Sequence, residues 1–207
     1  MRSAFVLAFL AVAAWSLGQV RALDQHPQQG LADMLLEYLS ARYPQQPVTG
    51  DVLYISVHRQ RLFHVREGRL VADFPIATAR NGLGTAVDSY RTPTGLHRVA
   101  EKIGDDVPPM GILKDRVYTG RLADPDPQGP DKDWITSRIL WLDGLEPGVN
   151  QGPGVDSRGR YIYIHGTASE CTVGMPSSMG CIRMRNTDVI ALYDEVPVGA
   201  LVVVLDN

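Results

Sequence analysis

Two residues in the carboxyl-terminal part of the chain, His165 and Cys181, are of the types that perform nucleophilic catalysis. A cysteine attacks as its thiolate, and a histidine within hydrogen-bond reach takes the thiol proton and later returns it to a leaving amine. His165 ends a strand-like run, and Cys181 lies between Gly180 and a second such run, residues 182–184. The fifteen residues between them are enough for a loop that returns to an adjacent strand. We therefore predict a nucleophile and its base.

Residues beside this pair have predicted supporting roles. Gly166 lets the backbone turn after the histidine, and we expect its carbonyl to orient the His165 ring, as the acid does in a serine triad. Gly180 leaves room for a substrate carbonyl, and the backbone N–H groups of Gly180 and Cys181 are candidates for an oxyanion site. Strand alternation places Arg183 on the same side as Cys181.

Four residues have two interpretations each. Arg183 binds a substrate carboxylate or holds the cleft together through an ion pair. Ser178 donates a hydrogen bond in the cleft or forms a turn. Tyr163 shares the side of His165 by strand parity and contacts substrate or packs. For Thr167 we favour a hydroxyl that fixes the loop over a direct role in catalysis.

The two cysteines, Cys171 and Cys181, leave an alternative. Two cysteines in an exported protein commonly form a disulfide, which would make the chain a non-catalytic periplasmic binding module. We favour a catalytic thiol, because the setting of Cys181 between a glycine and a strand displays its side chain. A metal site from His165 and both cysteines ranks low, because no CxxC or HxxxH spacing is present, and we expect no metal.

The amino terminus is predicted to be a signal peptide, residues 1–22. Arg2 precedes an apolar run of ~12 residues, too short to span a bilayer, and Val20-Arg21-Ala22 fits a cleavage site. An uncleaved anchor is the rival interpretation. Cleavage removes Arg2 and Arg21 and no acid, which leaves 18 basic against 23 acidic residues, or −5. We expect secretion across the inner membrane, no remaining membrane segment and no nucleic-acid partner.

The remaining chain predicts one mostly β domain, residues 51–207, preceded by a peripheral helix and linker, residues 23–50. Of the 207 residues 44% are apolar and 21% charged, which is typical of one globular core. Apolar residues recur with helical period over residues 31–43, which Pro44 and Pro47 end. Strand patterns cover residues 52–57, 61–65, 70–78, 96–103, 134–143, 160–165, 182–184 and 200–205.

Three features refine this architecture. The segment 104–133 is long for a simple connection, and loops of this kind are usually lids, binding loops or mobile segments. Asn186 is predicted to cap a second helix that ends at Pro197. The final strand is almost wholly apolar, so we expect it at the centre of the sheet, covered on both faces. The fold class is a mostly β sandwich or barrel-like fold with one or two helices.

Taken together, these motifs resemble the L,D-transpeptidase catalytic domain, often called YkuD-like. The family pattern is His-Gly-Thr, a variable loop, then Ser-x-Gly-Cys followed by Ile/Val-Arg-Met/Leu and Asn, and the resemblance covers residues 51–206. Many relatives have a histidine where this chain has Met179, and Cys171 is not part of the pattern. The matching residues here are His165-Gly166-Thr167, Ser178-Met179-Gly180-Cys181-Ile182-Arg183-Met184, Asn186, Asp188, and the flanks Arg61-Leu62, Thr92-Pro93-Thr94-Gly95 and Val196-Pro197-Val198-Gly199.

The resemblance implies a reaction on peptidoglycan stem peptides in the periplasm or cell wall. Cys181 would attack the peptide carbonyl between a diamino acid and D-Ala, release D-Ala and form a thioester, which an amine resolves into a cross-link or an attached protein. Attack by water would instead make the chain an L,D-carboxypeptidase or endopeptidase. No cofactor is implied, a part in cell-wall biogenesis and cell shape is the expectation that follows from the resemblance, and we expect a monomer.

Overall fold

The structure is a computed structural model that describes residues 27–125 and 134–207. The predicted signal peptide and residues 126–133 of the predicted loop lie outside this part of the chain. Within it, neither α-helix combines the length and apolar character that crossing a bilayer requires.

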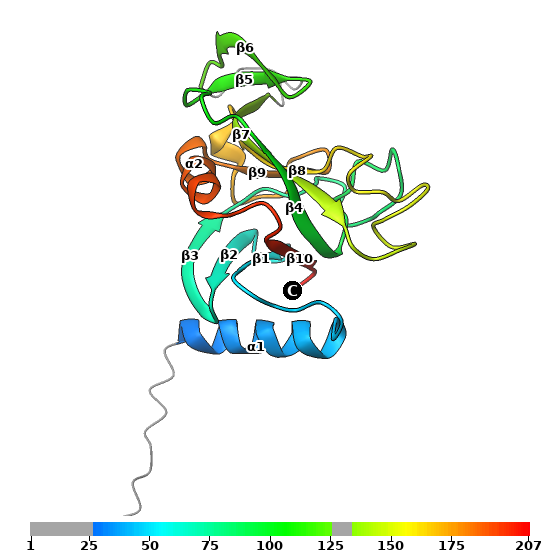
Figure 1. Ribbon diagram of the computed structural model, residues 1–207. Coiled ribbons are helices and arrows are strands. Elements are labelled where there is room, and N and C mark those ends of the chain that lie inside the picture. Colours follow the sequence, from blue (N-terminus) through cyan, green and yellow to red (C-terminus); the bar gives the residue numbers. More distant parts are fainter. Residues whose placement is uncertain (1–26, 126–133) are drawn as a thin grey trace, which may run out of the picture.

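One curled sheet of ten strands forms the framework, and two helices pack against it (Figure 1). The strands are hydrogen-bonded in the order β3-β2-β1-β10-β4-β7-β5-β6, while β8 pairs with β7 and β9 with β8. The mostly β fold class is thus confirmed. The elements are α1 (Pro27–Arg42), β1 (Asp51–Ser56), β2 (Arg61–Arg66), β3 (Arg69–Pro75), β4 (Gly95–Ile103), β5 (Gly111–Lys114), β6 (Val117–Leu122), β7 (Ile135–Gly144), β8 (Tyr163–Thr167), the 3₁₀ turn η1 (Glu170–Thr172), β9 (Ile182–Met184), α2 (Asn186–Glu195) and β10 (Leu201–Leu205).

The last strand, β10, occupies the centre of the sheet as predicted. It pairs in parallel with β1 and antiparallel with β4. Val202 and Val204 enter the core on the α2 side, whereas Val203 enters the core on the α1 side. An apolar strand is required here because both of its faces are covered.

The first three predicted strands form the antiparallel meander β1–β2–β3, with β3 at the edge of the sheet. Pro75 ends β3, where its missing N–H costs no interior ladder bond. The predicted continuation to residue 78 is wrong as a strand. Ala77 and Ala79 instead form single bridges to Arg183 and Ser178, in the segment around Cys181.

Helix α1 closes one face of the sheet, as the sequence predicts. Leu35 and Leu39 are buried among side chains of β1 and β2, and Figure 1 shows the helix lying across that end of the molecule. The helix begins at Pro27, four residues before the predicted start, and proline is favoured in a first helical turn. Met34, one of the apolar residues of the predicted helix 31–43, is 61% exposed.

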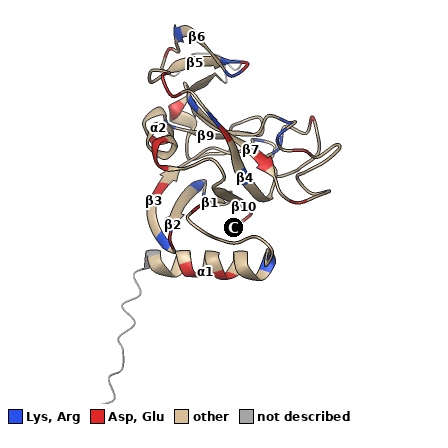
Figure 2. Ribbon diagram, in the orientation of Figure 1, with Lys and Arg blue, Asp and Glu red and all other residues tan. Residues whose placement is uncertain are grey.

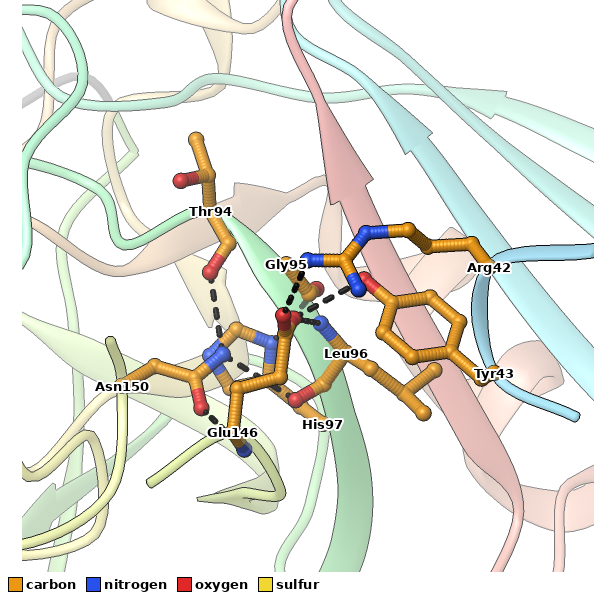
Figure 3. A network of polar contacts seen from close by, with 8 residues as sticks. All are labelled: Arg42, Tyr43, Thr94, Gly95, Leu96, His97, Glu146 and Asn150. Atoms are coloured by element: carbon orange, nitrogen blue, oxygen red, sulfur yellow. Dashed lines mark hydrogen bonds and ion pairs between the residues drawn. The ribbon is translucent and has the colours of Figure 1, made fainter. Parts of the chain in front are cut away.

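A polar network around Glu146 attaches the end of α1 to β4 (Figure 3). The Glu146 carboxylate accepts hydrogen bonds from the Tyr43 hydroxyl at 2.9 Å and the Leu96 N–H at 2.6 Å, and Arg42 lies 3.4 Å away. Burial, together with Glu146, raises the pKa of Tyr43, so its hydroxyl stays a donor at neutral pH. Asn150 accepts the Glu146 N–H and donates to the Leu96 carbonyl. This network is a structural joint between the peripheral helix and the domain.

The segment predicted as one long loop instead contains the hairpin β5–β6. Its two-residue turn, Asp115-Arg116, has φ values of 50° and 68°, the positive values of a type I′ turn. Glycine and asparagine are the usual residues there, so the turn carries no sequence signal. Figure 1 shows this hairpin at the end of the molecule opposite α1.

Charges of both signs are interspersed over the described elements (Figure 2). Several basic residues are neutralised across strands, for example Arg98 by Asp143 at 2.6 Å and Arg66 by Asp51 at 2.8 Å.

Candidate active site

Strands β8 and β9 bring the predicted nucleophile and base together. They run parallel, and His165 is the Cα partner of Arg183. Cys181 lies directly before β9 and packs against the cluster that contains Tyr163. Strand alternation puts Tyr163 and His165 on the same face of β8.

The His165 ring is buried and its orientation is fixed by its own backbone neighbour. Nδ1 lies 2.8 Å from the Gly166 carbonyl oxygen. A carbonyl only accepts, so Nδ1 carries a proton, and the lone pair of the neutral ring is on Nε2. Gly166 permits this arrangement because a Cβ there would lie 2.6 Å from the Thr136 carbonyl and 2.8 Å from Asn186 Oδ1.

Cys181 is half-buried at the start of β9. Its Sγ donates to the Tyr161 carbonyl at 3.3 Å, and it packs against a cluster that includes Tyr163, Ile139 and Trp141. Cys171 is exposed on the turn η1, and both cysteines are present as thiols. Within the described residues, no set of three His, Cys, Asp or Glu side chains is arranged to hold a metal ion.

The loop before Cys181 is held by hydroxyl groups. Gly180 has φ of +130°, a conformation that other residues rarely adopt. Its N–H donates to Ser178 Oγ at 3.2 Å, and Ser178 Oγ donates to the Cys181 carbonyl at 2.6 Å. On the other side, the Gly180 carbonyl accepts a 2.9 Å hydrogen bond from Thr92, which also accepts from the Ala79 N–H. Ser178 therefore has the geometry of a turn residue.

Thr92 is a site residue that sequence reasoning missed. In the sequence Thr92-Pro93-Thr94-Gly95 was only a flank of the family pattern, although Thr92 is fully buried and bonds to the loop before Cys181. The match of this segment to the family pattern could have marked Thr92 as important. The residues around Thr92 in the sequence do not identify Gly180 as its hydrogen-bond partner.

Arg183 is 4% exposed and lies against the loop that connects His165 to Cys181. Its Nη2 donates to Ser177 and lies 3.4 Å from the Thr172 hydroxyl. These contacts fit the interpretation in which Arg183 holds the cleft together. Thr167 is also buried, and its hydroxyl accepts the Ser169 N–H at 3.2 Å, a loop-fixing contact.

Asn186 does not cap α2, so that prediction is wrong. The cap is Arg185, without a side-chain hydrogen bond. The buried Asn186 amide instead donates to the Thr167 carbonyl at 2.9 Å and to Glu170 at 2.7 Å, and its oxygen accepts from Thr136 at 2.7 Å. Tertiary contacts with the His-Gly-Thr segment take up the side chain that a cap would use.

Two arginines lie near Cys181, and neither was a sequence candidate. Arg160 interacts electrostatically with Cys181, and burial lowers the pKa of Arg160. Its guanidinium donates to the carbonyls of Arg91 at 2.6 Å and Thr85 at 3.0 Å. Arg116 donates to the Tyr163 hydroxyl at 3.3 Å. Burial raises the pKa of Tyr163, and Arg116 opposes the rise.

A cavity of about 250 Å³ adjoins this site. Two residues of its lining also interact with the thiol. The Tyr161 carbonyl accepts a hydrogen bond from Cys181 Sγ, and Arg160 interacts electrostatically with Cys181. Residues around the cavity include one carboxylate and several exposed apolar side chains. They are Val87, Asp88, Tyr90, Gly159, Arg160, Tyr161, Ile162 and Met179.

The fold and site define a mostly β protein in which a cysteine and an oriented histidine lie on one face of two parallel strands. The family model of the L,D-transpeptidase catalytic domain, YkuD, matches residues 50–204, and the chain belongs to that family.

Individual relatives match over shorter stretches. "Probable L,D-transpeptidase ErfK/SrfK" of Salmonella typhimurium is 48% identical over 49 residues, which is 24% of this chain and 16% of that protein. "Putative L,D-transpeptidase YqjB" of Bacillus subtilis is 33% identical over 102 residues, 44% of this chain and 58% of that protein. The chain thus matches less than two thirds of either relative. A solved structure of L,D-transpeptidase 3 from Mycobacterium tuberculosis, with a faropenem-derived adduct, has a TM-score of 0.49 and 17% identity over 76% of this chain and 60% of that one.

Proposed function

We propose that this protein is an exported L,D-transpeptidase that acts on peptidoglycan stem peptides through a thioester on Cys181. The observation that carries the proposal is the pairing of β8 with β9. It brings the segment that begins after Cys181 alongside the strand of His165, whose Nδ1 lies 2.8 Å from the Gly166 carbonyl. Membership of the family supports the same reaction class.

In the acylation step, the Cys181 thiol gives its proton to Nε2 of His165 and the sulfur attacks the carbonyl that precedes D-Ala. The positive charge of Arg160 favours the thiolate. Backbone N–H groups of Gly180 and Cys181 receive the developing oxyanion. The contact of the Gly180 N–H with Ser178 is 3.2 Å, at the long limit for such bonds, so a charged oxygen competes for it. His165 then returns the proton to the amine of D-Ala, which leaves.

In the transfer step, an acceptor amine attacks the thioester carbonyl and gives a proton to His165. The carbon–sulfur bond breaks, and the proton returns to the Cys181 sulfur. The new amide is a cross-link between stem peptides or an attached amine. A thioester suits a compartment without ATP, because it keeps the energy of the broken peptide bond for the new one. The chain needs no cofactor for these steps.

The test is incubation of the purified protein with a tetrapeptide muropeptide, followed by mass spectrometry of protein and products. We expect a covalent adduct on Cys181, loss of D-Ala, and a dimer or exchanged D-amino acid. Trimmed product alone would establish a hydrolase instead. A protein that forms no adduct and no product would contradict the proposal.

Export is tested separately by the amino terminus of the protein recovered from the periplasm. Cleavage after Ala22 gives a chain that begins at Leu23. An intact amino terminus on membrane-bound protein would favour the uncleaved anchor.

A further inference from the structure

Arg116 occupies a turn position that an arginine adopts at a cost. Asp115 and Arg116 both have positive φ, 50° and 68°, where glycine or asparagine is the unstrained choice. Non-glycine residues in this region are uncommon and concentrate at functional sites. The turn directs the Arg116 side chain from the β5–β6 hairpin towards β7 and β8, where it makes its contacts.

Aromatic side chains beside the thiol hold the Arg116 guanidinium. It lies 4.9 Å from the centre of the Trp141 ring and 5.4 Å from that of Tyr161, and it donates to the Tyr163 hydroxyl at 3.3 Å. Trp141 stacks on Tyr161 and meets Tyr163 edge to face. These contacts fix the guanidinium plane before any ligand binds, which reduces the entropy lost on binding.

The group of aromatic residues that holds Arg116 also borders Cys181. Its Sγ donates to the Tyr161 carbonyl, and its side chain packs against the cluster that contains Tyr163 and Trp141. Arg116 and Cys181 therefore border the same group of aromatic side chains.

Arg116 is better placed to meet a ligand than the other two arginines of this site. Arg160 donates to four groups of the protein, three of them backbone carbonyls, and Arg183 is 4% exposed. Arg116 is partly exposed and uses one nitrogen for Tyr163. A guanidinium has five N–H donors in a planar fork, so further donors remain for a carboxylate.

We propose that Arg116 binds the terminal carboxylate of the donor peptide, that is, the carboxylate of the residue that leaves. This inference rests on the proposed function. In a tetrapeptide donor, the scissile carbonyl carbon and that carboxylate carbon are three covalent bonds apart, within about 4 Å. A cation that borders the same aromatic group as Cys181 can therefore meet the carboxylate while the sulfur meets the carbonyl. Arg116 thereby selects donors that end one residue after the cleaved bond.

The experiment compares a tetrapeptide that ends in D-Ala carboxylate with the same peptide ending in an amide. Dissociation constants are measured by calorimetry in the Cys181→Ala background, so that no chemistry intervenes. We expect the acid to bind about ten- to a hundredfold more tightly than the amide, the range of hydrogen bonds to charged groups. Arg116→Gln in that background should weaken the acid to the level of the amide and leave amide binding unchanged.

Arg158→Gln is the matched control. Arg158 lies 4.3 Å from the centre of the same Trp141 ring, but it pairs with Glu101 at 3.0 Å. This variant should keep the preference for the acid. The inference would be overturned if acid and amide bound equally well, or if neither bound measurably. It would also be overturned if the preference were lost in Arg158→Gln but kept in Arg116→Gln.

Turnover by the wild type separates this inference from the proposed function. Binding that prefers the acid, without any adduct or product, would leave Arg116 as a carboxylate site and remove the transpeptidase. Turnover with equal kcat/KM for acid and amide would support the transpeptidase and remove the carboxylate site at Arg116. That comparison uses no variant, so it decides the question even if Arg116→Gln fails to fold.

Discussion

Cys181 and Cys171 are close in sequence but stand in different surroundings. Cys181 lies against aromatic side chains on the His165 face, whereas Cys171 is exposed on η1. Cys181→Ala should lower turnover of the tetrapeptide by roughly 10³-fold or more, because no other group replaces the nucleophile. Cys171→Ala should stay within about twofold of wild type. Initial rates check both, with circular dichroism as the folding control. An inactive Cys171→Ala protein would mean that the other sulfur is the nucleophile.

Thr92 is predicted to act through the position of Cys181. Valine has the shape of threonine but leaves the Gly180 carbonyl and the Ala79 N–H without the hydroxyl that now serves both. Thr92→Val should therefore reduce the free energy of unfolding by about 1–3 kcal/mol. It should also reduce kcat/KM by about tenfold, because the loop before Cys181 shifts and moves the sulfur.

Urea unfolding and steady-state kinetics measure the two effects. Thr187→Val is the control, since the Thr187 hydroxyl is exposed on α2 and donates to the adjacent Asp188. Full activity in Thr92→Val would show that the loop before Cys181 keeps its position without the hydrogen bond from Thr92.

At the residue scale, short motifs led to His165 and Cys181, while their supports came only from the structure. The His-Gly-Thr and Gly-Cys segments are local in sequence, and the fifteen residues between them allowed a return to an adjacent strand. Thr92 and Arg116 reach the same site from distant segments. Nothing in the sequence near either residue specifies which strand it will face.

Among the elements, α1 offers the clearest test of packing. Leu39 is 1% exposed against β1 and β2, whereas Met34 on the same helix is 61% exposed. Leu39→Ala should reduce the free energy of unfolding by about 2–5 kcal/mol through the cavity left behind. Met34→Ala should change it by less than about 0.5 kcal/mol. Chemical denaturation measures both values, and equal effects would show that α1 does not pack in solution as it does here.

The accuracy of the element predictions followed the strength of the local signal. β1, β2 and β10 have long apolar or alternating runs, and their predicted positions agree with the structure within one residue. The β5–β6 hairpin has short strands and an Asp-Arg turn, so its pattern was lost among the prolines and glycines of 104–133. Asn186 has the right residue type for a cap, but buried partners on β7 and β8 take its side chain.

Across the whole molecule, the pH dependence of stability should reflect the buried His97. Its ring lies 3.0 Å from the Gly95 carbonyl and 3.0 Å from the Ser157 hydroxyl, and so joins β4 to the loop after β7. Burial lowers the pKa of His97 to about 4, although the Gly95 contact and the carboxylates of Glu146 and Asp143 oppose the shift. The unfolded chain binds a proton near pH 6.5, and the folded protein does so only near pH 4.

The unfolded state therefore holds more protons between these two values, and stability is full above pH 6.5 and falls as pH decreases towards 4. The loss from this one group is about 3 kcal/mol. Urea unfolding of wild type and His97→Gln at pH 7.5 and pH 4 measures it, because the carboxylates titrate in both proteins and cancel in the difference. His97→Gln should lose about 3 kcal/mol less than wild type over this interval, while the exposed His58→Gln should match wild type. An equal loss of unfolding free energy in wild type and His97→Gln between pH 7.5 and pH 4 would mean that His97 is protonated in the folded protein well above pH 4.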